Sequence, residues 1–292
     1  MEKDWQQEKE MSNIFWLKLI IRLALKLPRW SIRLLLYPIV LFFFLTSGHK
    51  RKASYHYLTQ ALPHRPQVWH VYKHFYWFAA TLVDHVYFLS GQTRLFDISF
   101  INREVVVNSL EKNPSQFLLS GHYGSIHALR TQLSDKKYQI RPVVKLEHNQ
   151  NIVTLFNQLN PDFYKDIIPY DGLNTIFEIY ENLKNNVSIA LLADRPIGDG
   201  KTLSVQFLND TIQLPKSLFE MLLRLPFSAN LFFSKYLGKN SYQIEYFSFS
   251  IASNDTPQTL AQKFADKLAK QCLESPYNWF NFYVYWDSKD HV

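Results

Sequence analysis

The 292-residue chain is long enough for one large domain with a terminal appendage, and its 47% hydrophobic content excludes an intrinsically disordered protein. A net charge of +7 favours an anionic partner, which narrows the choice to anionic lipid, nucleic acid or an acidic protein. No nucleic acid is expected, because the sequence has no zinc-finger spacing, no RNA-binding aromatic signature and no Lys/Arg run beyond residues 49–52.

The first fifty residues predict a membrane-associated helical segment. Residues 15–27 place an apolar residue at every fourth position among basic ones, which is typical of a helix lying on anionic lipid. Residues 34–45 form a nearly continuous apolar run of about a dozen residues, whereas a spanning helix needs roughly 20. We therefore expect a monotopic anchor over residues 1–50 and a cytoplasmic body over residues 51–292. A pair of buried core helices is the alternative.

Two further helices are expected over residues 53–62 and 66–89. The second carries His70, His74 and His85, and the spacing of the first two would suit a metal ion. A closed metal site needs more ligands than this helix supplies. We interpret these residues as hydrogen-bonded or solvated histidines and expect no metal and no cofactor.

From about residue 96 the pattern alternates between strands and helices, which predicts an α/β domain with a mostly parallel, mixed sheet flanked by helices. The expected strands span residues 96–101, 116–120, 138–144, 187–193, 227–234 and 242–247, with a hairpin over 203–208 and 211–214. The expected helices span residues 104–111, 125–132, 150–159 and 174–183, one begins at Pro215, and the last is capped by Thr256. The only cysteine, Cys272, excludes a disulfide framework and is expected in the core of that last helix.

The chain is organised around residues 117–127, which read as a buried strand, a Gly-bracketed turn and the start of a helix. The turn presents His122 between Gly121 and Gly124. A helix that begins near Gly124 would aim unpaired backbone N–H groups at whatever lies beside His122. A base and oxyanion donors on one turn suit acyl transfer.

Polar residues follow three of the expected strands, and ligands of open α/β sheets bind beyond such strand ends. His122 would act as the general base, while Lys145 and Arg195, next to Asp194, would hold a phosphate or polarise a thioester carbonyl. The alternative is that Lys145 and Arg195 are surface cations. A metal held by His122 and His127 is disfavoured, because a spacing of five turns the two side chains about 140° apart on a helix.

His127 stands where an orienting carboxylate would be expected, five residues after the base. A second histidine can accept a hydrogen bond and fix the tautomer, but it brings no negative charge to the imidazolium. The alternative is that His127 is a helix-face residue packed against the sheet.

Together these blocks resemble the lysophospholipid acyltransferase superfamily, and within it the bacterial lipid A biosynthesis lauroyl/myristoyl acyltransferases and their aryl-polyene cluster relatives. The family's His-x4-Asp/Glu motif matches residues 120–127 (SGHYGSIH), with His127 in place of the acid. A later family block of Asp with Gln or Arg matches residues 193–198 (ADRPIG), and residues 276–283 (PYNWFNFY) resemble the aryl-polyene branch.

The resemblance implies a protein at the cytoplasmic face of a bacterial inner membrane that moves a fatty acyl group from acyl carrier protein to a lipid or glycolipid hydroxyl. It implies His122 and His127 as the catalytic pair and Gly124, Lys145, Asp194 and Arg195 as substrate-binding residues. Because His127 replaces the acid, a catalytically silent homologue that binds acyl carrier protein or lipid is the alternative.

Overall fold

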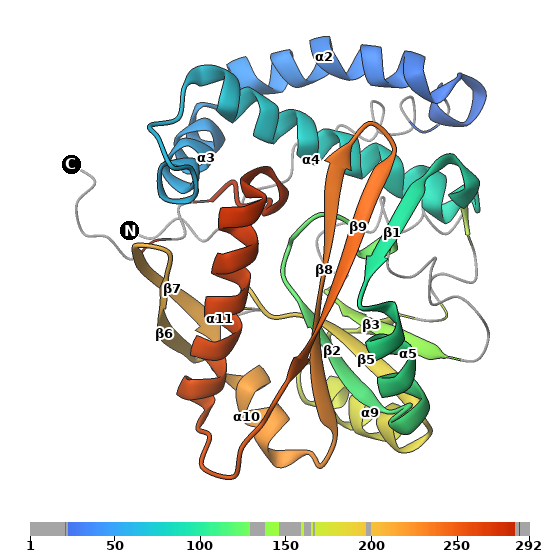
Figure 1. Ribbon diagram of the computed structural model, residues 1–292, viewed down its shortest axis with the longest axis vertical. Helices are drawn as coiled ribbons and strands as arrows, with labels where there is room; N and C mark the ends of the chain where they lie inside the picture. Colours follow the sequence, from blue (N-terminus) through green and yellow to red (C-terminus); the bar gives the residue numbers. More distant parts are fainter. Residues whose placement is uncertain are drawn as a thin grey trace.

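The structure is a computed structural model that describes residues 21, 23–128, 138–145, 159–160, 165, 167–196, 200–283 and 286. Its centre is a seven-stranded mixed sheet in the order β1-β9-β8-β2-β5-β3-β4 (Figure 1). All neighbouring strands run parallel except β8 and β9, which pair antiparallel. The predicted α/β class with a mostly parallel, mixed sheet is therefore confirmed.

The strands follow the predicted hydrophobic runs closely. Every residue of β2 is buried, as befits the middle strand of a sheet covered on both faces. The predicted hairpin forms a separate two-stranded sheet, β6 with β7. The strands are β1 (Asp97–Ile101), β2 (Gln116–Ser120), β3 (Gln139–Val144), β4 (Ile168–Pro169), β5 (Val187–Leu192), β6 (Thr202–Phe207), β7 (Asp210–Pro215), β8 (Ser228–Gly238) and β9 (Ser241–Phe249). Only the two-residue β4 was not predicted.

The helices also match their predictions, apart from those that lie outside the described residues. The helices are α2 (Arg29–Thr46), α3 (Gly48–Ala61), α4 (Val68–Leu89), α5 (Arg103–Lys112), α9 (Leu173–Lys184), α10 (Lys216–Arg224) and α11 (Pro257–Glu274). Thr256 caps α11 by accepting a hydrogen bond from the Thr259 N–H, and Cys272 is buried on that helix. Of the expected helices, residues 150–158, half of 125–132 and most of 15–27 lie outside the described residues.

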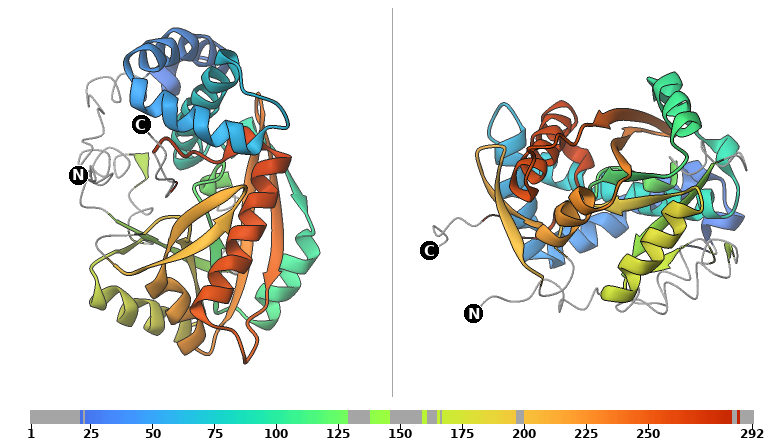
Figure 2. Two further views of the ribbon diagram at one scale, coloured as in Figure 1. Left: turned by 90° about the vertical axis from the view of Figure 1, so that its left-hand side faces the viewer. Right: turned by 90° about the horizontal axis from the view of Figure 1, so that it is seen from below.

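Helices α2, α3 and α4 form a layer stacked on one end of the sheet (Figures 1 and 2). Val40 and Phe44 of α2 belong to the same apolar core as Phe117 of β2, so this layer is continuous with the sheet's own packing. The boundary expected at residue 50 lies within α3. The helical layer also meets the end of β8, since Trp77 of α4 packs edge-on against Tyr236.

Candidate active site

Three neighbouring parallel strands, β2, β5 and β3, carry the polar residues singled out in the sequence. β5 pairs with β2 on one side and with β3 on the other. His122 follows β2, Asp194 and Arg195 follow β5, and Lys145 follows β3. Parallel neighbours end at the same edge of a sheet, so the fold brings all three chain segments to one edge.

The turn after β2 packs tightly against β8, and this is why it contains Gly124. Gly124 has a φ of +61°, and a Cβ atom built on it would lie 1.5 Å from the carbonyl oxygen of Ser234. The Gly124 N–H donates to the carbonyl of Asn278 at 2.8 Å. A side chain here would therefore push the turn away from β8 and displace His122, because a positive φ and close backbone approach are conditions that glycine meets.

Each N–H from His122 to Ser125 has an acceptor within the protein, so these four are not among the unpaired N–H groups expected at the start of the following helix. The His122 N–H donates to Asp194 Oδ2, and the Tyr123 N–H to the carbonyl of Gly121. The Gly124 and Ser125 N–H groups donate to the carbonyls of Asn278 and Ser234. These four N–H groups hold the turn in its conformation, so they do not form an oxyanion hole.

His122 is bound by the carboxylate of Asp194. Its Nδ1 atom lies 2.8 Å from Asp194 Oδ1, and its backbone N–H donates to Oδ2 of the same carboxylate at 2.9 Å. The Asp194 side chain is 0% exposed, whereas the His122 side chain is 37% exposed. One nitrogen of the imidazole therefore faces a buried anion while the ring stays open to solvent.

The charge state of Asp194 fixes the tautomer of His122. Burial raises the pKa of Asp194, but the charge and hydrogen bonds of His122, with the charge of Arg195, outweigh burial and hold that pKa well below its usual range. An ionised carboxylate can only accept hydrogen bonds, so Nδ1 of His122 carries a proton. In the neutral ring Nε2 is then the basic nitrogen.

The aromatic segment 279–283 near the C-terminus contacts both His122 and Asp194. Trp279, fully buried, donates from Nε1 to Asp194 Oδ2 at 2.9 Å. The Phe280 N–H donates to the carbonyl of His122 at 2.9 Å. Arg195 donates from Nη2 to the carbonyl of Phe280 at 2.7 Å, and its guanidinium lies over the ring of Tyr283. This segment therefore holds the Asp194 carboxylate, the turn at His122 and the Arg195 guanidinium together.

His127 does not contact Asp194 in any described interaction; its ring lies against that of His85, with 4.4 Å between the centroids. Burial lowers the pKa of His85 to about 4. His74 of α4 is also buried, and its two ring nitrogens bind Ser54 Oγ and the carbonyl of Trp279. His70 accepts a hydrogen bond from the Gln67 N–H. His70 and His74 therefore serve packing and hydrogen bonding in the helical layer, as interpreted from the sequence.

Two contacts of the site were not predicted from the sequence. Asp194 is expected as a substrate-binding residue, whereas its buried carboxylate accepts hydrogen bonds from His122 and Trp279. The second contact is that of Trp279, for which the sequence predicts no role. Both residues of the first contact follow predicted strands, but the hydrophobic pattern does not say which strands are neighbours, so the sequence does not indicate that contact. No local spacing indicates the second, since Trp279 is 85 residues from Asp194 in the chain.

Comparison with known proteins adds the reaction class. A family model described as bacterial lipid A biosynthesis acyltransferase matches residues 1–288. No curated protein matches the chain. Members of such a family use an acyl donor and a lipid acceptor and are membrane-associated in general. Among the described residues one helix, Arg29–Thr46, is long and apolar enough to cross a membrane by length and composition.

Proposed function

The chain belongs to the bacterial lipid A biosynthesis acyltransferase family, and from this premise we propose that it transfers a fatty acyl group to a lipid hydroxyl with His122 as the general base. The observation that carries the proposal is the hydrogen bond between His122 Nδ1 and the buried carboxylate of Asp194. The Asp194 carboxylate supplies the negative charge that orients His122, which the histidine at position 127 cannot supply. The pairing of an imidazole with a buried carboxylate recurs in enzymes that activate hydroxyl groups.

In the proposed reaction, Nε2 of His122 removes the proton from the acceptor hydroxyl as its oxygen attacks the carbonyl carbon of an acyl thioester. The tetrahedral intermediate collapses by breaking the carbon–sulfur bond. The leaving thiolate then takes the proton from the imidazolium, so His122 returns to its neutral form. Asp194 stabilises the imidazolium between these two steps and holds the ring in one orientation.

Lys145 and Arg195 are the cations that we assign to the substrate. Arg195 lies beside Asp194 and is held over Tyr283, and Lys145 follows β3 at the same sheet edge. A cation here would polarise the thioester carbonyl or bind a phosphate of the acceptor. Gly124 contributes by letting the turn approach β8, as its close contact with Ser234 indicates.

We assign acyl carrier protein as the donor and a lipid or glycolipid of the bacterial inner membrane as the acceptor, with the body of the enzyme on the cytoplasmic face. The net charge of +7 supports the donor, because carrier proteins are acidic and opposite charge speeds encounter. The apolar helix α2 supports the membrane assignment. The C-terminal run of residues 276–283 supports the aryl-polyene branch of the family.

The alternative is a catalytically silent homologue, which we consider because position 127 has no acidic residue. Since the carboxylate of Asp194 already binds His122, the missing acid at position 127 no longer argues against catalysis. Acyl transfer is therefore the better supported function. The test is transfer of a labelled acyl chain from acyl carrier protein thioester to membrane lipid by the purified full-length protein. Product formation that His122→Ala abolishes supports the proposal, and binding of thioester without any turnover by the wild type contradicts it.

A further inference from the structure

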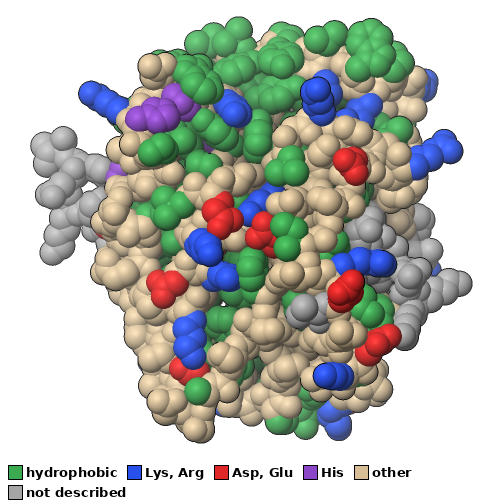
Figure 3. Space-filling view, in the orientation of Figure 1, with side chains coloured by type: hydrophobic (Ala, Val, Ile, Leu, Met, Phe, Trp, Pro, Cys, Tyr) green, Lys and Arg blue, Asp and Glu red, His purple; other side chains and the backbone are tan. Residues whose placement is uncertain are grey.

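Helix α2 is apolar on two opposite faces. Its inner face, formed by Ile32, Leu36, Val40 and Phe44, is buried. Its outer face consists of Trp30, Leu34, Tyr37, Leu41, Phe42 and Leu45, all of them exposed, with Trp30 at 68%, Phe42 at 59% and Leu45 at 63%. We call these six residues the outer face of α2. Hydrophobic side chains gather over this end of the molecule (Figure 3).

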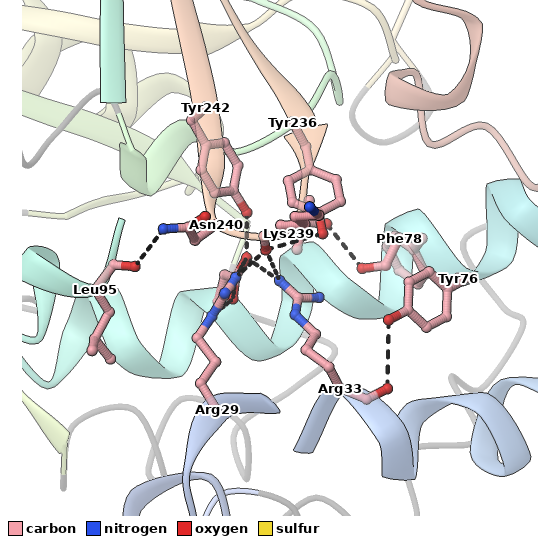
Figure 4. A network of polar contacts seen from close by, with 11 residues as sticks. Arg29, Arg33, Tyr76, Phe78, Leu95, Tyr236, Lys239, Asn240 and Tyr242 are labelled. Carbon is pink, nitrogen blue, oxygen red and sulfur yellow. Dashed lines mark hydrogen bonds and ion pairs between the residues drawn. The ribbon is translucent and has the colours of Figure 1, made fainter. Parts of the chain in front are cut away.

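The outer face carries no charge, because the two charged residues of α2 point inward. Arg29 donates two hydrogen bonds from Nη2 to the carboxylate of Asp84 in α4, at 2.9 and 3.0 Å, and Arg33 pairs with the same carboxylate. Asp84 is fully buried and also accepts a hydrogen bond from the Tyr242 hydroxyl. Figure 4 shows Arg29 and Arg33 reaching from α2 toward this cluster and the carbonyl of Lys239.

The rest of α2 is fixed to the helical layer as well. Tyr72 of α4 donates its hydroxyl hydrogen to the carbonyl of Tyr37 at 2.9 Å. Arg51 of α3 donates to the carbonyl of Leu45 at 2.8 Å, which satisfies one of the last carbonyls of α2. Contacts at both ends and in the middle therefore hold α2 along α4.

These contacts decide between crossing a membrane and lying on it. An 18-residue helix is about 27 Å long, close to the roughly 30 Å of a bilayer core, so length alone allows crossing. If α2 crossed while attached, α4 would enter the bilayer with Lys73, Asp84 and the buried His74, and β8 would follow. If α2 crossed alone, Asp84 would lose both arginines and stay buried without a cationic partner.

We infer that α2 lies in the plane of an anionic lipid surface, with its outer face in the acyl region, and does not cross the bilayer. This inference rests on the membrane association proposed above and specifies its geometry. A shallow groove of about 680 Å³ continues the apolar surface between α2 and the start of α4, where Val68 and Trp69 are exposed. Trp30 and Trp69 suit this placement, because tryptophan is favoured at the membrane–water boundary.

The charge around the outer face of α2 favours anionic lipid over a second protein as its partner. Arg29 and Arg33 are paired with Asp84, but residues 34–83 contain no Asp or Glu and five further basic residues, namely Lys50, Arg51, Lys52, Arg65 and Lys73. A second copy of this chain would bring the same positive charge to the same face, which disfavours a dimer there. An acidic carrier protein would present charged side chains to an outer face that has none. A bilayer with anionic headgroups offers both apolar contact and complementary charge.

Flotation of the purified full-length protein with lipid vesicles tests the surface. Vesicles containing half phosphatidylglycerol should bind it about tenfold more tightly than pure phosphatidylcholine. The double variant Phe42→Gln/Leu45→Gln should bind the anionic vesicles about tenfold more weakly or worse. The matched control is Phe177→Gln in α9, whose side chain is 70% exposed far from α2, and it should bind like the wild type. Equal binding by the double variant, or a dimer or carrier-protein complex that the double variant abolishes, overturns the inference.

The position of α2 is tested by cysteine labelling at its two ends, in cells that express Ser31→Cys or Ser47→Cys. The native Cys272 is 0% exposed and adds little background. In-plane binding predicts that a membrane-impermeant maleimide labels both cysteines from the same side, in inverted inner-membrane vesicles but not in spheroplasts. Labelling of one end from each side overturns the inference. Labelling of both from the outside supports an in-plane helix but contradicts the cytoplasmic face in the proposed function, so the two claims fail separately.

Discussion

His122 Nδ1 and Asp194 Oδ1 lie 2.8 Å apart although the two residues are 72 positions apart in the chain. The contact forms because β2 and β5 are neighbouring parallel strands and the two residues follow their carboxyl ends. The motif position five residues after the base holds His127, whose ring packs on His85 instead. In this protein the carboxylate that binds His122 therefore follows the neighbouring strand β5 and does not come from the five residues after the histidine.

Because Asp194 is the carboxylate that binds His122, we expect His127 to be dispensable for the chemistry. His127→Ala removes a ring that contacts His85, so we expect kcat to stay within about threefold of the wild type, with a modest loss of stability. His122→Ala should abolish turnover, because no other base is placed there. Both are measured as the rate of acyl transfer from carrier-protein thioester. A loss of several orders of magnitude in His127→Ala, with the fold intact by circular dichroism, would show that His127 takes part in catalysis.

Trp279 should act as a positioning residue through Nε1. Trp279→Phe keeps an aromatic ring in the core but removes the hydrogen bond to Asp194 Oδ2. A lost hydrogen bond to a charged group is worth about 1.5–3 kcal/mol, so we expect kcat to fall by about tenfold or more with KM nearly unchanged.

The matched control for Trp279→Phe is Trp286→Phe. Trp286 is buried and packs on Phe207, but its Nε1 has no hydrogen-bond partner among the described residues. Equal kcat losses in the two variants, or a change in KM alone for Trp279→Phe, would contradict a role that acts through Asp194.

Protonation of His74 should destabilise the fold at mildly acidic pH. Burial lowers the pKa of His74 to about 4, from 6.5 for an exposed ring, against a smaller opposing effect of its hydrogen bond to Trp279. Between these two values the unfolded chain binds a proton that the folded protein excludes, so stability falls as pH falls from about 6.5 to about 4. The loss from this group is on the order of 3 kcal/mol.

The variant His74→Gln keeps a donor and an acceptor but cannot titrate. Its free energy of unfolding, measured by denaturant titration at several pH values, should depend less on pH over this window than that of the wild type. His49→Gln, which changes an exposed histidine, should keep the wild-type dependence. Parallel curves for the wild type and His74→Gln would show that His74 is not held neutral.

Gly124 should tolerate no side chain. In Gly124→Ala the new Cβ meets the Ser234 carbonyl oxygen at 1.5 Å, in a backbone conformation that alanine disfavours. We expect a loss of more than about 3 kcal/mol in unfolding free energy, or failure to fold, measured by denaturant titration. Gly48→Ala, where the nearest atom is 3.7 Å away, should change stability by less than about 1 kcal/mol. A soluble Gly124→Ala of wild-type stability would contradict the packing of this turn.

Much of the fold was predictable because local hydrophobic pattern decides it. The apolar run Phe117–Leu119 suits a fully buried strand, and β2 spans the predicted residues 116–120. The strand-end rule also placed His122, Lys145 and Asp194 at one edge. The pattern could not say that β5 and β8, rather than β3, lie next to β2, and the pairing of β2 with β5 is what brings Asp194 to His122.

The contacts made by the C-terminal aromatic run were not predictable for a similar reason. Trp279 reaches Asp194, and His74 reaches the carbonyl of Trp279, across 85 and 205 residues of chain. Such contacts depend on how helix α4 and the tail pack together over the sheet, which no local spacing encodes. The turn itself shows the same limit: Gly124 indicated a tight turn, but only the position of the C-terminal segment shows that its N–H donates to the carbonyl of Asn278.

The central claim is that the Asp194 carboxylate makes His122 a base, and the turnover of Asp194→Asn tests it most directly. The amide can hold the ring in the wrong tautomer, so kcat should fall by about four orders of magnitude while the protein stays folded. Asp266→Asn, an exposed change on α11, should keep the wild-type rate. An Asp194→Asn protein that is folded and transfers acyl groups at close to the wild-type rate would contradict the account.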